Sequence, residues 1–356
     1  MENNEKRNSK LFLHIGLHKT GTSSIQTALI QNKNNLINEG IFYFNDLNFF
    51  NNILHNDIFS NKLLNKCIIQ LENISKTKKN TIQKIIISNE AFSGNPFNGY
   101  KNIEIIIKYL SEIGKRFDTK IILYLRRQDE LMESLYIQSI KEGETLIFED
   151  FIKTLKYDSF NWSNYIRVWM QNFSKNQLIV RMYDKKTLKN GDIVSDFANI
   201  IESQLLKNDN NYYEENKRYS QGSLEVARML NQYLNDNDKK YVRSLLEKIN
   251  TKIRFDSFAL FTKKGRKKVL SYFKKCNTEL LNDFPFLCSR EFFKTDVESD
   301  KPVHSYLEKS KNYNHIISDL ISSLINENTT LKYKTKPSLK NLYRMLIYIL
   351  KKIAIN

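Results

Sequence analysis

Near its N-terminus the chain reads His14-Ile15-Gly16-Leu17-His18-Lys19-Thr20-Gly21-Thr22-Ser23-Ser24. A short apolar run at 11–16 precedes this segment, and apolar residues at helical spacing follow it through 22–38. We therefore predict a strand, a tight turn and a helix. Glycines allow the backbone to turn tightly and to approach an anion closely. The free amides and the dipole of a helix start then favour a bound phosphate or sulfate.

The side chains of this turn suit an anion as well. Lys19 adds a mobile positive charge, and the hydroxyls of Thr20, Thr22 and Ser23 can donate hydrogen bonds. The standard nucleotide-hydrolase loop has its lysine directly after the second glycine, followed by a hydroxyl that binds Mg²⁺. Here Lys19 precedes Gly21, and no acidic residue on a following strand is clearly placed for a metal. The pattern predicts a transfer reaction without a metal.

The first half of the chain alternates strand and helix signals. Further short apolar runs occupy 41–44, 84–87, 121–125 and 177–183, and helical patterns occupy 101–115, 128–142 and 162–174. Short apolar strands between amphipathic helices predict an α/β fold, in which a parallel sheet has helices on both faces. Beyond about residue 190 only helices are expected, over 192–202, 222–235, 239–250, 263–282 and 305–325.

A second anion contact is predicted at the end of the run 121–125. Arg126 and Arg127 follow this strand, and Ser134 lies eight residues after Arg126, two turns into the next helix. The planar guanidinium binds phosphate through two hydrogen bonds. Ligands in open α/β sheets bind at the carboxyl ends of the strands, so this contact and the glycine turn should share one crevice.

A carboxylate, Glu90, follows the strand at 84–87 and should reach the same crevice. Glu90 is the first candidate for a general base, and His18 is the second because it flanks the turn. An exposed or helix-capping role for Glu90 is as compatible with the sequence. His14 lies inside the first strand and is expected to be a core group.

The glycine turn resembles the donor-binding loop of the sulfotransferase family, whose bacterial carbohydrate-type members carry a close match to His-x-Gly-x-His-Lys-Thr-Gly-Thr-[Ser/Thr]-Ser. The run that begins at Arg126 and Arg127 also resembles these members, which have Arg and then Ser eight residues later. The likeness covers roughly residues 10–285, and it is strongest at these two motifs.

The resemblance implies a three-layer fold of the P-loop NTPase type and transfer of a sulfuryl group from 3′-phosphoadenosine 5′-phosphosulfate. Lys19 and the loop would hold the 5′-phosphosulfate, while Arg126 and Ser134 would hold the 3′-phosphate. Glu90 or His18 would act as the base. The implied donor-site residues are Gly16, His18, Lys19, Thr20, Gly21, Thr22, Ser23, Arg126 and Ser134. The acceptor would be a hydroxyl, with a surface glycan favoured over a lipid or a small alcohol.

Three parts are expected. Residues 1–205 would form the donor-binding core, and 206–300 would complete that core and the acceptor cleft with helices. Residues 301–356 would form a helical extension that ends in a basic amphipathic tail at 338–356. Such a tail is typical of helices that lie on an anionic membrane surface. Packing against the main domain or a partner is at least as common a role for such a helix, and it is favoured slightly over membrane contact.

Composition bounds the remaining alternatives. The formal net charge is +17, which favours anionic partners, although lysine is abundant throughout the chain. The three cysteines lack a paired spacing, which argues against a disulfide framework or a zinc site.

The polar N-terminus lacks a secretory signal, and no apolar run reaches the ~20 residues of a membrane span. We therefore expect a cytoplasmic enzyme, with peripheral contact at the inner membrane face if the tail binds lipid.

Two other functions stay open. The first is a P-loop kinase of a small molecule or sugar, which would need the standard lysine position and a Mg²⁺ site. The second is a basic protein that binds nucleic acid without catalysis, to which the lysine-rich segment 263–275 would contribute. No recognised nucleic-acid-binding module surrounds that segment, so nucleic acid is not an expected partner.

Overall fold

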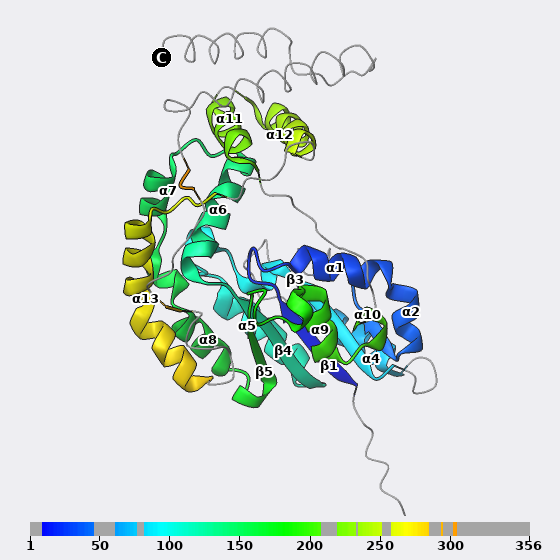
Figure 1. Cartoon of the computed structure of the whole chain (residues 1–356). Helices are drawn as coiled ribbons and strands as arrows, with labels where there is room; N and C mark the ends of the chain where they lie inside the picture. The colour runs from blue at the N-terminus through cyan, green and yellow to red at the C-terminus, as the bar shows by residue number, and fades with distance from the viewer. Residues whose placement is uncertain are drawn as a thin grey trace, which may run out of the picture. The chain divides into compact units, whose positions relative to one another are not determined.

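The computed structural model describes residues 9–45, 61–76, 82–207, 219–232, 234–250, 258–284, 293–294 and 302–304. They fall into two compact units, each built from several separate stretches of chain (Figure 1). The first comprises the described parts of Met1–Leu131, Leu155–Glu215 and Leu270–Thr295. The second comprises those of Met132–Thr154, Asn216–Val269 and Asp296–Asn356. The three-part division expected from the sequence stays a prediction.

A five-stranded parallel sheet forms the centre of the first unit. In spatial order its strands are β2 (Ile41–Tyr43), β3 (Lys84–Asn89), β1 (Lys10–Ile15), β4 (Asp118–Leu125) and β5 (Leu178–Met182). All neighbouring strands pair in parallel, and every strand lies where the sequence predicted one. The predicted α/β class with a parallel sheet is confirmed.

One face of the sheet packs against four helices: α1 (Thr22–Gln31), α2 (Lys33–Asn38), α9 (Ile193–Ile201) and α10 (Gln204–Lys207). Side chains alternate between the two faces of a strand, so Phe12, Ile86 and Ile122 share this core with α1 and α9. The single helix expected over 22–38 is two helices, because the backbone of Asn32 leaves helical geometry between them.

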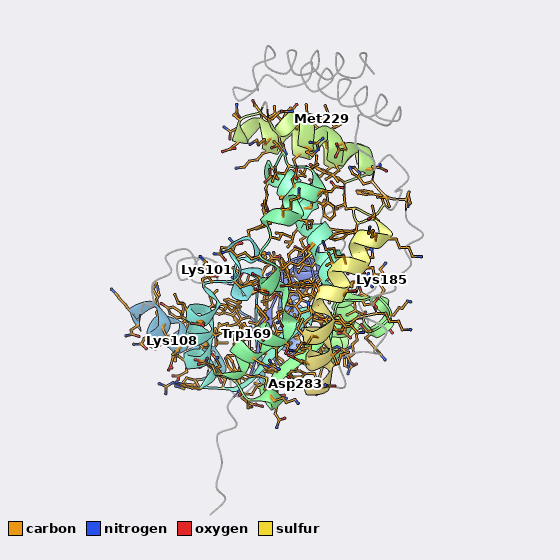
Figure 2. The ribbon with its side chains drawn as sticks, turned by 90° about the vertical axis from the view of Figure 1, so that its left-hand side faces the viewer. Lys101, Lys108, Trp169, Lys185, Met229 and Asp283 are labelled. Atoms are coloured by element: carbon orange, nitrogen blue, oxygen red, sulfur yellow. The ribbon has the colours of Figure 1, made fainter. Side chains whose placement is uncertain are left out.

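The alternate strand residues, among them Leu13, Ile87 and Leu123, are fully buried toward the opposite face. Two helices lie on that side, α4 (Asn61–Lys76) and α5 (Ile103–Gly114) (Figure 1). Figure 2 places Lys108 of α5 and Lys185, which precedes α9, on opposite sides of the sheet. The sheet is therefore the middle of three layers. Sequence analysis missed α4, which buries only Leu64, Cys67 and Leu71.

The other elements connect these layers. The remaining helices are α6 (Gln128–Glu142), α7 (Phe148–Thr154), α8 (Trp162–Met170), α11 (Gln221–Asn231), α12 (Asp236–Asn250) and α13 (Lys263–Asp283). Short 3-10 turns are η1 (Glu90–Ser93), η2 (Pro96–Asn98), η3 (Tyr157–Phe160), η4 (Lys175–Gln177) and η5 (Lys189–Gly191). Both tryptophans, Trp162 and Trp169 of α8, are fully buried.

The second unit contains most of α6, all of α7, α11 and α12, and the start of α13. Its buried carboxylates are paired. Glu133 accepts hydrogen bonds from the backbone N–H groups of Leu260 and Phe261, at 2.9 and 3.0 Å, and from the Arg266 guanidinium at 2.8 Å. These bonds offset the cost of burying a charge and fix the start of α13 against α6.

The basic tail at 338–356, the helix expected over 305–325 and Cys288 lie outside the described residues. Cys67 and Cys276 are buried, and neither is in a disulfide among the described residues. Of the helices that the structure describes, none combines the length and apolar character needed to cross a membrane.

Helix α9 is attached to the sheet by a buried charge. The carboxylate of Asp196, 1% exposed, accepts a hydrogen bond from the Tyr124 hydroxyl at 2.9 Å and two from the Arg181 guanidinium. We expect Asp196→Ala to lower the free energy of unfolding by about 3 kcal/mol, because it leaves Arg181 and Tyr124 unpaired. Urea unfolding measures this loss.

Asp192→Ala on the same helix is the matched control. Asp192 caps α9 by accepting from the Ser195 N–H at 2.7 Å, and loss of a cap costs about 1 kcal/mol. If the Asp196 variant lost no more stability than the Asp192 variant, the Asp196 network would not be what fixes α9.

Candidate functional site

The predicted site residues follow strands that end at one edge of the sheet. Ile15, the last residue of β1, pairs with Asn89 of β3 and with Leu123 of β4. This register places Gly16 next to Glu90, and Arg126 follows the end of β4 three residues beyond Leu123. The chain builds β2 and β3 on one side of β1 and β4 and β5 on the other. The β1–α1 turn therefore lies where the strand order reverses, the usual ligand position in such sheets.

The backbone of the turn has two residues with positive φ, Lys19 at 63° and Gly21 at 80°. A left-handed lysine is uncommon and costs conformational energy, so the surrounding contacts must maintain it. The Thr20 hydroxyl supplies one such contact by donating to the Leu17 carbonyl at 2.6 Å. Gly21 is the N-cap of α1, and its glycine adds no side-chain acceptor at this helix start.

Gly16 allows the turn to pack tightly against α1. A Cβ atom at Gly16 would lie 2.2 Å from the Thr22 Oγ1 atom, far inside contact distance. At Gly21 a Cβ would be 3.2 Å from both Ile193 and Tyr183. Close approach therefore favours glycine at both positions, and the positive φ of Gly21 favours glycine there as well.

The threonine hydroxyls of the turn are directed into the protein. Thr20 is 1% exposed and bonds to the Leu17 carbonyl, while Thr22 is 4% exposed with its hydroxyl against Gly16. The buried side chains of Thr20 and Thr22 thus pack beneath the turn and stabilise its backbone. A ligand contact through the backbone amides of these residues stays a prediction. Ser23 is more exposed than either threonine.

His18 and Glu90 come together as a pair. His18 Nδ1 is 2.9 Å from Glu90 Oε1, and His18 Nε2 is 3.1 Å from the Gly94 carbonyl oxygen. Carbonyl and carboxylate oxygens both accept hydrogen bonds, so each ring nitrogen of His18 faces an acceptor. The two side chains stay partly accessible, at 28% for His18 and 40% for Glu90.

The charge of Glu90 is stabilised by its surroundings. Burial alone would raise the pKa of Glu90, but four favourable interactions outweigh it and hold the pKa below its usual value. They are the hydrogen bond from His18, the positive charges of His18 and Lys19, and a hydrogen bond from the Lys19 backbone. Glu90 is thus an ionised carboxylate in contact with the glycine turn.

Arg126 contacts the glycine turn from the end of β4. Its Nη1 atom donates to the Lys19 carbonyl at 2.8 Å, which directly connects the end of β4 to the turn after β1. The guanidinium lies over the Tyr183 ring, 5.5 Å from the ring centroid, and the Arg126 carbonyl accepts from Trp162 Nε1 at 2.9 Å. Lys19, His18, Glu90 and Arg126 therefore form one cluster.

Arg127 has a different environment. Its guanidinium makes a fork with the fully buried Asp129, at 2.6 and 3.0 Å, and Nη2 also lies 3.0 Å from Glu130 Oε1. Burial would lower the pKa of Arg127, but the hydrogen bond and charge of Asp129 raise it overall. Arg127 thus stabilises the start of α6 rather than facing the turn.

Ser134, the second residue predicted for the Arg126 contact, lies on α6 in the second unit and is half-buried. Its part in the site stays a prediction. At the start of the same helix, Gln128 exchanges two amide hydrogen bonds with Asn277 of α13, at 2.7 and 3.2 Å. Whether the later helices cover an acceptor also stays a prediction.

Sequence reasoning missed Tyr183 and Trp162 as neighbours of the site. Tyr183 follows β5 directly, and it contacts both Gly21 and Arg126 through its ring. The available signal was its position at a strand end, which does not show what an aromatic ring contacts. Nothing in the sequence links Trp162 to the Arg126 carbonyl 36 residues earlier.

Among the described residues, no group of three or more His, Cys, Asp or Glu side chains is arranged to hold a metal ion. The metal-free reaction that the loop pattern predicts stays a prediction.

No family model matches the chain. An uncharacterized protein of Archaeoglobus fulgidus is 28% identical over 233 residues, covering 64% of this chain. The match spans 62% of the length of that relative. A crystal structure of a sulfotransferase from Alicyclobacillus acidocaldarius aligns over 80% of this chain and 98% of its own, with 13% identity and a TM-score of 0.39. The fold assignment rests on the five-stranded parallel sheet.

His14 lies just before the turn and is fully buried. Its Nδ1 atom is 2.8 Å from the Ser88 hydroxyl, and its ring packs against Tyr124 and Phe197. Burial lowers the pKa of His14 to about 3, with a small opposing effect from the charge of Glu90. His14 is therefore neutral in the folded protein at physiological pH.

This burial predicts a pH dependence of stability. Below about pH 6.5 the unfolded chain protonates His14 but the folded protein does not, so acid favours unfolding. We expect the free energy of unfolding to fall as the pH drops from about 6.5 towards 3, by up to about 1.4 kcal/mol per pH unit from this group. Urea unfolding of the wild type and His14→Gln from pH 7 to pH 5 isolates this part. Parallel pH curves for the two proteins would contradict it.

Proposed function

We propose that this chain is a sulfotransferase that moves a sulfuryl group from 3′-phosphoadenosine 5′-phosphosulfate to an acceptor hydroxyl. The observation that carries the proposal is the 2.8 Å hydrogen bond from Arg126 Nη1 to the Lys19 carbonyl. It brings together two elements that each suit an anion, the glycine turn after β1 and the arginine after β4. A nucleotide with anionic groups on both its 5′ and 3′ oxygens matches such a pair better than one with a single phosphate chain.

Each residue of the cluster has a role in this proposal. The amides of the turn at Gly21, Thr22 and Ser23 and the Lys19 ammonium bind the 5′-phosphosulfate. Arg126, with Ser134 of α6, binds the 3′-phosphate. Two aromatic side chains hold Arg126 in place: the Tyr183 ring packs against its guanidinium, and Trp162 donates a hydrogen bond to its backbone carbonyl.

Glu90 is the base in the proposed mechanism. Glu90 is ionised, so its carboxylate can accept a proton, and it lies against the glycine turn through its contacts with His18 and Lys19. Glu90 takes the proton of the acceptor hydroxyl as that oxygen bonds to sulfur. The bond from sulfur to the bridging oxygen of the 5′-phosphate breaks, and adenosine 3′,5′-bisphosphate leaves with the electron pair.

Lys19 neutralises the negative charge that develops on the bridging oxygen, as preorganised donors do in related transfers. His18 keeps the Glu90 carboxylate oriented between the turn and the η1 segment. We propose a glycan hydroxyl as the acceptor, with lipids and small alcohols as the alternatives that an acceptor screen would compare.

Calorimetric titration tests the donor site directly. We expect adenosine 3′,5′-bisphosphate to bind without Mg²⁺ and more tightly than ATP, and Arg126→Ala to weaken that binding at least tenfold while leaving adenosine 5′-phosphate unaffected. In kinetic assays the same variant should raise the KM of the donor. Preference for ATP with Mg²⁺ would favour the kinase alternative. Nucleic acid binding that salt weakens, with no nucleotide affinity, would favour the other alternative.

Turnover tests the role of the lysine. Lys19→Ala should reduce kcat by at least about 10²–10³-fold, the usual effect of removing one preorganised donor, while the thermal unfolding midpoint stays near that of the wild type. Lys33→Ala, which removes an exposed lysine from α2, is the control and should keep full activity. Undiminished activity in the Lys19 variant would remove this residue from the chemistry.

A further inference from the structure

A carboxylate stands beside the arginine that the proposed function assigns to the 3′-phosphate. Glu130, in the first turn of α6, has Oε2 3.6 Å from Arg126 Nε and Oε1 3.0 Å from Arg127 Nη2. One side chain therefore faces both arginines. The side chains of Arg126 and Glu130 are 23% and 36% exposed, so solvent screens their charges incompletely.

The two contacts of Glu130 are unequal. The distance to Arg127 is that of a charge-assisted hydrogen bond, whereas 3.6 Å to Arg126 is too long for one. Within the part of the chain that the structure describes, the buried Arg126 Nε has no hydrogen-bond acceptor. Glu130 thus attracts Arg126 by charge without fixing its orientation. It can give up this contact and keep its hydrogen bond to Arg127.

Arg126 does not need Glu130 to stay in position. Its Nη1 atom is held by the Lys19 carbonyl, its guanidinium plane by the Tyr183 ring, and its backbone carbonyl by Trp162. These three contacts all lie within the first unit and come from two of its stretches, Met1–Leu131 and Leu155–Glu215. Removing the charge of Glu130 would leave all of them intact.

We infer that Glu130 competes with the nucleotide's 3′-phosphate for Arg126. A phosphate that binds Arg126 must approach a carboxylate of the same sign, and this repulsion lowers nucleotide affinity. The consequence falls on the product as well as the donor, because adenosine 3′,5′-bisphosphate retains the 3′-phosphate after transfer. Glu130 therefore speeds release of the product nucleotide. The inference rests on the proposed function, in which Arg126 binds the 3′-phosphate.

Glu130→Gln tests this, since it keeps the shape of the side chain and removes its charge. We expect adenosine 3′,5′-bisphosphate to bind about fivefold more tightly to the variant in calorimetry, the size of one partly screened charge interaction. Its dissociation rate, measured by stopped-flow displacement, should fall by a similar factor. The affinity for adenosine 5′-phosphate, which lacks the 3′ group, should not change.

Glu112→Gln is the matched control. It makes the same change in net charge on α5, where Glu112 pairs with Lys115 on the surface, and should leave both affinities unchanged. Equal or weaker binding of the bisphosphate to Glu130→Gln would overturn the inference. Equal tightening of both nucleotides would do so too, because Glu130 would then act on the whole site and not at Arg126. If the wild type bound neither nucleotide, the proposed function itself would fail.

Discussion

Parallel pairing of β1 with β3 on one side and β4 on the other places the whole cluster. Because Ile15 is level with Asn89 and Leu123, the turn after β1 and the acidic residue after β3 start from the same height of the sheet. The longer β4 brings Arg126 above them, where it reaches the Lys19 carbonyl. A shift of register by one residue would reverse the faces of the strand and bury these groups differently.

The cluster balances its charges through a few specific pairs. Glu90 faces His18 and Lys19, Asp129 faces Arg127, and Glu130 lies between the two arginines. Arg127 makes hydrogen bonds to Asp129 and an ion pair with Glu130 at the start of α6. Arg126 keeps a buried Nε atom without an acceptor among the described residues. The acidic and basic side chains around the turn therefore offset one another in charge.

Buried polar groups around the site have a structural role that supports this arrangement. Asp196 ties α9 to β4 and β5, and α9 in turn supplies Ile193 against Gly21. The Thr20 and Thr22 side chains face inward beneath the turn. Much of the hydroxyl-rich motif therefore shapes the backbone, whose left-handed Lys19 directs its carbonyl toward Arg126.

The sequence by itself determined the α/β class, the five strands and the two motifs at strand ends, because period-two and period-3.6 patterns and glycine positions are local properties of the chain. It also singled out Lys19, His18, Glu90 and Arg126. It did not determine the break at Asn32, the helix α4 or the contacts of Tyr183 and Trp162. Only the tertiary structure decided that His18 pairs with Glu90 and that Glu130 faces Arg126, since such pairings depend on how strand ends and side chains converge in space.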